Sequence, residues 1–266
     1  MIGQTNLLKT LSRYNRDTFP RSIILCGEEG SGKHTITNYI SQNIIKFEIL
    51  DITDNISDEY LDQIYRNPNP YIYLIDLNKL TEKSQNIILK FVEEPLNNSF
   101  IILLTNTTFN VLNTIINRCV IFNMDNYTDD ELKTFIENKE NEELILQAVR
   151  TPGKILNNDL SNLKDLNDVV DKMVSKLSNA SYANTLTIAN KINYKDEYNK
   201  FDLDIMLNTL SYKLYKTYLE MNNKNMLEMY LLTVNERKKL IDTRLNKELF
   251  MQNYLTKLWK LSKGIK

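Results

Sequence analysis

The stretch IILCGEEGSGKHT, residues 23–35, decides the fold, because it joins a short apolar segment, a glycine-rich loop and the start of a helical pattern. Gly27, Gly30 and Gly32 let the backbone turn tightly, so that successive amide groups can point inward. The start of the following helix adds its positive end, and Lys33 adds a full positive charge. Together these features predict a phosphate-binding loop (P-loop) after a β-strand.

The residue after the P-loop lysine bears on magnesium binding. In P-loop proteins this position carries a Ser or Thr whose hydroxyl binds Mg²⁺, but here it is His34, the single histidine of the chain. A neutral imidazole is a poor ligand for a hard cation. Thr35 cannot replace it, because one helical step turns a side chain by about 100°. Magnesium binding is therefore not expected, and a catalytic acid or base role for His34 requires partners that the sequence does not reveal.

Short apolar segments alternate with helical patterns from residue 23 to about 124, as is typical of a parallel sheet flanked by helices. The five predicted strands are rich in Ile, Leu, Val and aromatic residues: 23–26, 47–52, 71–76, 100–105 and 119–124. Segment 81–94 places its apolar residues on one helical face and stops at Pro95, which predicts a helix. The sequence thus predicts an α/β domain with a five-stranded parallel sheet.

The pattern becomes helical after about residue 125, with two short helices that end at the Thr-Pro-Gly motif of residues 151–153. From about residue 165 onward there is no Pro, the only Gly lies near the end of the chain, and apolar residues recur at helical spacing. We therefore predict an α/β domain over residues 1–125, a small helical lid over 126–164 and an all-helical domain over 165–266.

Composition narrows the class of protein. With 42% hydrophobic and 25% charged residues, the 266-residue chain is expected to be globular. No apolar run approaches the roughly 20 residues of a membrane helix, and residues 1–10 lack the features of a signal peptide. We therefore expect a cytoplasmic protein. The formal net charge of −1 implies that any contact with nucleic acid comes from a local patch or from partner chains.

The chain has two cysteines, Cys26 and Cys119, and each borders an apolar segment. Two thiols cannot form a disulfide framework or a four-cysteine zinc site. We expect both thiols to be reduced and buried.

The chain also lacks the residue that orients the attacking water in ATP hydrolysis. Segment 71–76 ends in Asp76, where a P-loop protein places a carboxylate associated with magnesium. In hydrolytic AAA+ proteins a glutamate follows and orients the attacking water, but here the next residue is Leu77, which cannot polarise water. With His34 at the magnesium position, two elements of the hydrolysis machinery are absent. The alternative is that Asp76 is only a polar strand end.

The run from residue 74 to residue 119 resembles the bacterial DNA polymerase III clamp-loader subunits, the gamma/tau and delta-prime proteins. In that family an aspartate-ended strand leads to a helix that finishes in Leu-Lys-x-x-Glu-Glu-Pro, and later to a helix that ends in Ser-Arg-Cys. The matching residues here are Leu89, Lys90, Glu93, Glu94, Pro95, Thr105, Asn106, Asn117, Arg118 and Cys119. Residues 2–4 are similar to the family's N-terminal phrase near the adenine pocket, and residues 244–261 resemble its last collar helix.

The resemblance implies roles for individual residues. Arg118 occupies the place of the family's arginine finger, which acts in trans on the ATP of a neighbouring subunit. Asn117 departs from the family's serine, and Lys154 falls where the lid carries a phosphate-sensing basic residue. The candidate nucleotide-binding residues are Gly27, Gly30, Ser31, Gly32, Lys33, His34, Thr35, Asp76, Asn106 and Lys154. For Arg118 the alternative is a surface arginine at a helix end.

This chain lacks two hydrolytic groups but retains Arg118, and in this combination it resembles the delta-prime subunits of the family. The resemblance implies a P-loop AAA+ domain, a lid and a helical collar, in a subunit that helps to load the sliding clamp onto primed DNA without hydrolysing ATP itself. The implied partners are the gamma/tau and delta subunits, the clamp and, through the assembly, primed DNA. ATP or ADP is expected to be held without turnover, and no zinc is expected because residues 41–70 contain no cysteine.

Two other functions stay open. One is an active, gamma/tau-like clamp-loader ATPase with a divergent site. The other is a P-loop nucleotide sensor, kinase or remodelling protein unrelated to replication.

Overall fold

The computed structural model describes most of the chain: residues 2–66, 69–96, 98–137, 139–157, 160–179, 202–241 and 245–264. These residues form two compact units, Met1–Leu132 with Thr151–Lys154, and Lys133–Arg150 with Ile155–Lys266. The separation of lid from collar at residue 164 stays a prediction. Residues 180–201 of the predicted collar, and Arg244 of its predicted last helix, lie outside the described residues.

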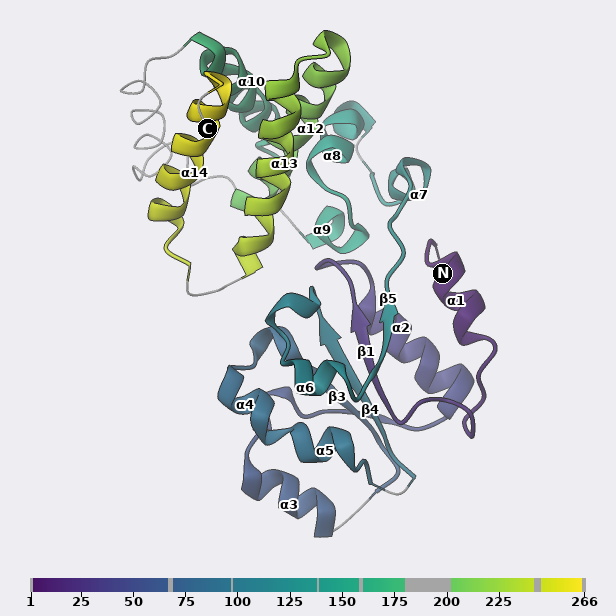
Figure 1. Ribbon diagram of the computed structural model, residues 1–266. Coiled ribbons are helices and arrows are strands. Elements are labelled where there is room, and N and C mark those ends of the chain that lie inside the picture. Colours follow the sequence, from purple (N-terminus) through teal and green to yellow (C-terminus); the bar gives the residue numbers. More distant parts are fainter. Residues whose placement is uncertain are drawn as a thin grey trace. The chain divides into compact units, whose positions relative to one another are not determined.

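The first unit contains a five-stranded parallel sheet in the order β2-β3-β4-β1-β5 (Figure 1). Its strands are β1 (Ser22–Cys26), β2 (Ile49–Asp51), β3 (Ile72–Asp76), β4 (Phe100–Thr105) and β5 (Val120–Asn123). Each lies within a predicted segment or departs from it by one residue, so the predicted sheet is confirmed. Because the strands are parallel, the loops that follow β1, β3 and β4 meet at one edge, where α/β folds bind ligands.

Helices cover both faces of this sheet (Figure 1). They are α1 (Thr5–Leu11), α2 (Lys33–Ile40), α3 (Asp58–Arg66), α4 (Glu82–Ile87), α5 (Leu89–Glu93) and α6 (Asn113–Ile116), with the π-helical turn η1 (Ser41–Ile45) and the 3₁₀ turns η2 (Thr53–Asn55), η3 (Leu77–Lys79) and η4 (Thr108–Asn110). Side chains alternate along each strand. Ile23 and Leu25 therefore enter the core beneath α1 and α2, whereas Ile24 enters the core shared with α3, α5 and α6. Two buried cores fix the sheet between its helices.

The helix predicted over residues 81–94 is interrupted. Thr81 caps its start by accepting a hydrogen bond from the Ser84 amide at 3.2 Å. The helix then breaks at Ile88, whose ψ of −6° departs from helical geometry, and α5 resumes at Leu89. Ile88 is fully buried, as is Phe91 in α5, so the predicted apolar face does meet the sheet. The 3.6-residue pattern identified the face but not the break.

The second unit is helical where the structure describes it. Its helices are α8 (Glu142–Ala148), α10 (Leu163–Asn179), α12 (Leu203–Met221), α13 (Lys224–Arg237) and α14 (Lys247–Ser262), with the 3₁₀ turns η5 (Lys139–Asn141) and η6 (Lys238–Ile241). The short helices α7 (Asp129–Lys133) and α9 (Pro152–Asn157) each span a boundary between the units. None of the described helices is long and apolar enough to cross a membrane.

The α12–α13 hairpin follows from local signals. Asp202 caps α12 through the amides of Asp204 and Ile205, at 2.8 and 3.2 Å. Asn222 ends the helix in the left-handed conformation, with φ of 48°, and Asn223 caps α13. Of the apolar residues predicted at helical spacing in this segment, Met206, Leu207, Leu210 and Leu214 are each at most 3% exposed, whereas Leu203 is only partly buried.

Candidate functional site

Three backbone carbonyl oxygens of the P-loop, Gly27–Lys33, accept hydrogen bonds from residues outside the loop. The Glu29 oxygen accepts a hydrogen bond from Thr151 Oγ1 at 2.8 Å, the Gly30 oxygen from the Gly153 amide at 2.9 Å, and the Ser31 oxygen from the Tyr127 hydroxyl at 3.0 Å. In a trans peptide the amide points opposite to the carbonyl. The amides that follow these carbonyls therefore point away from the protein groups that hold the loop.

Glycine is required at two positions of this loop. Gly30 and Gly32 have φ of 77° and 93°, in the left-handed region that favours glycine. In addition, a Cβ on Gly30 would lie 2.8 Å from the Lys154 nitrogen, and one on Gly153 would lie 2.5 Å from the Gly30 Cα. Segment 151–154 therefore packs on the P-loop backbone to backbone.

Lys33, the first residue of α2, is 9% exposed and saturated with hydrogen bonds. Its Nζ donates to the Gly27 oxygen at 2.6 Å, to the Glu28 oxygen at 3.1 Å and to Asn106 Oδ1 at 2.8 Å. An ammonium has three protons, so all its donors are engaged. Burial lowers the pKa of Lys33, and the nearby Asp76 carboxylate only partly offsets this. A phosphate would have to replace one of the three acceptors.

Asp76 and Asn106 are linked through a residue that the sequence did not single out. Asp76 Oδ1 accepts from the Asn78 amide at 3.0 Å and from Asn78 Nδ2 at 2.6 Å, which caps the η3 turn. Asn78 Oδ1 in turn accepts from the Asn106 amide at 2.9 Å. The predicted residues Lys33, Asp76 and Asn106 thus form one network at the carboxyl edge of the sheet. The Asp-x-Asn spacing after β3 was the signal for the Asn78 contact.

The position after Asp76 carries no carboxylate and no exposed group. Leu77 is 3% exposed and packs in the core that contains α3, α5 and α6. The side chains of His34 and Thr35, at the start of α2, are exposed. Ser31 is 4% exposed, and its Oγ has no hydrogen-bond partner in the part of the chain that the structure describes.

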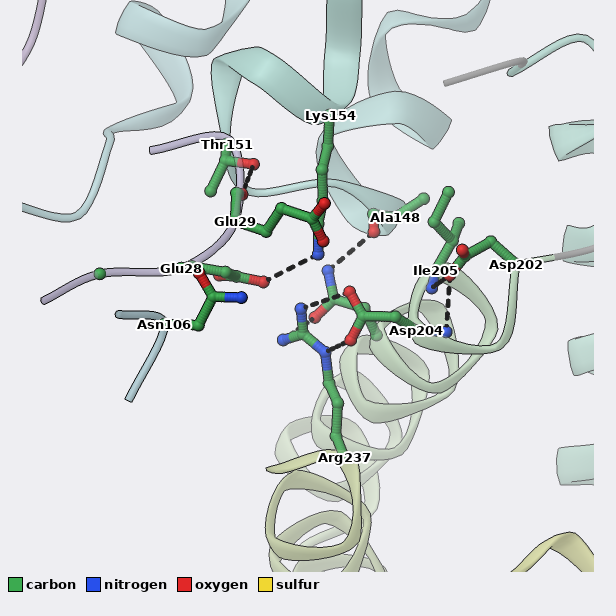
Figure 2. Close-up of polar contacts among 12 residues, drawn as sticks. Glu28, Glu29, Asn106, Ala148, Thr151, Lys154, Asp202, Asp204, Ile205 and Arg237 are labelled. Carbon is green, nitrogen blue, oxygen red and sulfur yellow. Dashed lines mark hydrogen bonds and ion pairs between the residues drawn. The ribbon is translucent and has the colours of Figure 1, made fainter. Parts of the chain in front are cut away.

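Lys154, predicted to sense phosphate from the lid, lies at the P-loop and faces a carboxylate there. Its Nζ lies 3.4 Å from Glu28 Oε1 (Figure 2). The Glu28 side chain is 37% exposed and that of Lys154 14%. The structure therefore places Lys154 at the phosphate-binding loop with part of its charge balanced by the loop itself.

The N-terminal phrase Ile2-Gly3-Gln4 is fixed to the chain that follows β5. The Gln4 side chain donates to the Asp125 oxygen at 2.9 Å and accepts from the Asp125 amide at 2.7 Å. Gly3 has φ of 72°, and a Cβ on it would lie 2.4 Å from a ring carbon of Tyr127. Tyr127 thus joins the N-terminus to the P-loop, a contact that the sequence did not reveal.

Arg118 lies away from this cluster. It precedes β5, whereas the P-loop follows the paired strand β1, and parallel strands place these points at opposite edges of the sheet. The separation is roughly the length of a four-residue strand, about 13 Å. Arg118 Nη1 donates to the Thr114 oxygen at 2.8 Å, and its Nε forms an ion pair with Glu93.

The cysteines are less buried than predicted: both Cys26 and Cys119 are only partly buried. Burial raises the pKa of the Cys119 thiol to about 12 and also raises that of Cys26. Both thiols are therefore protonated near neutral pH, because the thiolate is the disfavoured form. In the part of the chain that the structure describes, no three His, Cys, Asp or Glu side chains lie together so that they could hold a metal ion.

Part of the chain is similar to known proteins. Residues 46–128 match the family model described as "DNA polymerase III, delta subunit". DNA polymerase III subunit delta' of Haemophilus influenzae is 26% identical over 110 residues, which are 40% of this chain and 34% of that protein. The same subunit of Buchnera aphidicola is 27% identical over 85 residues, 32% of this chain and 25% of that protein. The chain thus matches about a third or less of the length of these relatives.

Among solved structures, a mutant of RuvB from Thermotoga maritima has a TM-score of 0.50 and 19% identity, over 84% of this chain and 78% of that chain. This likeness confirms the predicted α/β fold with a helical C-terminal region. The predicted resemblance to DNA polymerase III delta-prime subunits is also confirmed, by the family model over residues 46–128 and by the two relatives over 110 and 85 residues.

Proposed function

We propose that this chain is a delta-prime-like subunit of a DNA polymerase III clamp loader, which helps to load the sliding clamp onto primed DNA without hydrolysing ATP itself. The match of residues 46–128 to the DNA polymerase III delta subunit model and the similarity to a delta-prime subunit support this assignment. The proposed partners are the gamma/tau and delta subunits, the clamp and, through the assembly, primed DNA.

The main support for the non-hydrolysing role is the identity of the residue after Asp76. Leu77 is buried in the core and carries no group that could orient a water at the P-loop. Loss of one preorganised catalytic group commonly costs about 100-fold or more in rate. His34 at the magnesium position removes a second contribution. Hydrolysis by this chain is therefore expected to be negligible.

The P-loop nevertheless fits a phosphate. The left-handed glycines, the free amides of the first turn of α2 and the buried Lys33 supply donors of the right kind. The buried, unpartnered Ser31 hydroxyl adds a donor on the same loop. We propose that ATP or ADP is held here without turnover, and that Mg²⁺ and zinc are not required.

Arg118 is proposed to act in trans. It lies at the sheet edge opposite to its own P-loop and so cannot serve the nucleotide of its own subunit. A guanidinium stabilises the charge that develops on a transferred phosphoryl group. The neighbouring subunit's ATP is its proposed target.

The test is to purify the chain alone and with gamma/tau and delta subunits from the same source. The chain alone is expected to show no magnesium-dependent ATPase above background, and to copurify with the other subunits in a complex that binds the clamp. Turnover near 1 s⁻¹ or faster by the chain alone, a common enzymatic rate, would support the active ATPase instead. Failure to copurify would exclude the clamp-loader assignment.

A further inference from the structure

The side chain of Arg118 is held on its own subunit from two sides. Its Nε pairs with Oε1 of Glu93, the last residue of α5, and its Nη1 donates to the Thr114 oxygen of α6 at 2.8 Å. Within the described part of the chain, its Nη2 makes no hydrogen bond. Two anchors from two helices thus fix the plane of the guanidinium and engage Nε and Nη1 but not Nη2.

Glu93 contributes little to folding in this arrangement. Both side chains are 39% exposed, and exposed ion pairs are screened by water and salt. A long arginine side chain in solvent otherwise samples many rotamers, and ordering it at the moment of reaction costs free energy. Anchoring it beforehand reduces that cost.

We propose that Glu93 is the positioning residue for Arg118: it forms an ion pair with Nε and so presents the remaining amino group to the phosphate of a neighbouring subunit. This inference rests on the proposed trans role of Arg118. Glu93 itself touches no phosphate, and it acts only through the arginine. The predicted consequence is a change in the neighbour's turnover number, not in the neighbour's affinity for ATP.

The chain offers a matched control next to Glu93. Glu94 carries the same charge, is exposed like Glu93, and shows no contact with Arg118 in the structure. Replacement of either residue by alanine removes one negative charge near the end of α5, but only Glu93→Ala removes the anchor. Glu93→Gln keeps the size of the side chain and removes the charge that pairs with Nε.

The experiment measures clamp- and DNA-stimulated ATPase of the assembled loader with five versions of this chain: wild type, Glu93→Ala, Glu93→Gln, Glu94→Ala and Arg118→Ala. Glu93→Ala is expected to lower kcat by about 10-fold with KM for ATP unchanged, a part of the roughly 1,000-fold that a complete arginine finger contributes. Glu93→Gln, which removes the charge of the ion pair, is expected to lower kcat as Glu93→Ala does, and Glu94→Ala is expected to leave it unchanged. The thermal midpoint of each variant chain is expected to match wild type.

The double variant Glu93→Ala/Arg118→Ala separates the two proposals. If Glu93 acts only through Arg118, the double variant has the rate of Arg118→Ala alone. Additive losses, or a wild-type rate for Glu93→Ala while Arg118→Ala is impaired, would overturn the positioning role and leave the trans role intact. A wild-type rate for Arg118→Ala would instead overturn the trans role.

Discussion

At the scale of single residues, the P-loop depends on how closely two backbones approach. Gly30 and Gly32 share the left-handed conformation, but only Gly30 has another backbone against it, that of Gly153 and Lys154. The nearest atom to a Cβ on Gly32 is 3.5 Å away, an ordinary contact. A side chain at Gly32 would therefore add only backbone strain, whereas one at Gly30 would add strain and a steric clash.

We expect Gly30→Ala to destabilise the protein more than Gly32→Ala does. Both changes incur the left-handed cost of about 1 kcal/mol, and Gly30→Ala adds a backbone clash of about 1–3 kcal/mol. Thermal unfolding without nucleotide measures the difference. Gly153→Ala, which has the clash without the positive φ, provides the complementary comparison. Equal midpoints for Gly30→Ala and Gly32→Ala would show that segment 151–154 does not pack on the loop in solution.

At the scale of elements, one glutamine connects α4 to the loop that leads to α6. Gln85 is 4% exposed; its Nε2 donates to the Asn110 oxygen at 3.0 Å and its Oε1 accepts from the Leu112 amide at 3.0 Å. Both ends of the amide are thus used to satisfy backbone groups of another segment. Buried polar groups are costly when they lose their partners.

Gln85→Ala is expected to cost about 1–3 kcal/mol in the free energy of unfolding, because it leaves the Asn110 oxygen and the Leu112 amide without partners. Asn86→Ala is the control: Asn86 is exposed, and among the described residues its side chain bonds only the Glu82 oxygen of its own helix, at 3.0 Å. Urea denaturation measures both. A loss at Asn86 as large as that at Gln85 would show that the helix, and not the connection, determines the effect.

In the second unit, Glu236 of α13 links α14 and the η6 turn. It is 6% exposed and accepts from Lys257 at 2.8 Å and from Lys239 at 2.7 Å. Burial raises the pKa of Glu236, but the hydrogen bonds and charges of the two lysines outweigh burial and hold the pKa below its ordinary value. The ionised form is therefore favoured in the folded state.

This shift predicts a dependence of stability on pH. A carboxyl whose pKa is lower when folded stabilises the fold above its unfolded pKa, about 4.3 for Glu, and the stabilisation is lost as pH falls through the folded value. The unfolding free energy of wild type should therefore fall more steeply below about pH 5 than that of Glu236→Gln. Glu228→Gln, on the same helix and 4.0 Å from Lys224 at the surface, should keep the wild-type profile. Parallel profiles for wild type and Glu236→Gln would contradict the assignment.

At the scale of the whole molecule, charge limits what the chain does alone. A net charge of −1 gives no general attraction to nucleic acid. We expect the isolated chain to bind primed DNA with a Kd of about 10⁻⁴ M or weaker at about 150 mM salt, and the assembled loader to bind much more tightly. Fluorescence anisotropy over a salt series measures both. Micromolar binding by the chain alone, with a steep salt dependence, would reveal a local basic patch instead.

The sequence by itself determined the features that depend on local pattern. The strands were readable because doubly covered strands are continuous apolar runs, and the P-loop because its glycines, its lysine and its position between strand and helix are adjacent in the chain. The absence of a glutamate after Asp76 required no structure either. The residue type at a fixed distance along the chain from a motif is known from the sequence alone.

Only the tertiary structure decided which groups meet. The pairing of Lys154 with Glu28 joins residues 126 positions apart, and the contact of Gly153 with Gly30 joins backbones that carry no periodic signal. The ion pair of Arg118 with Glu93 likewise depends on how α5 and α6 pack. Periodicity specifies which face of an element is buried but not which side chain from another element lies opposite it, because that choice is made by packing in three dimensions.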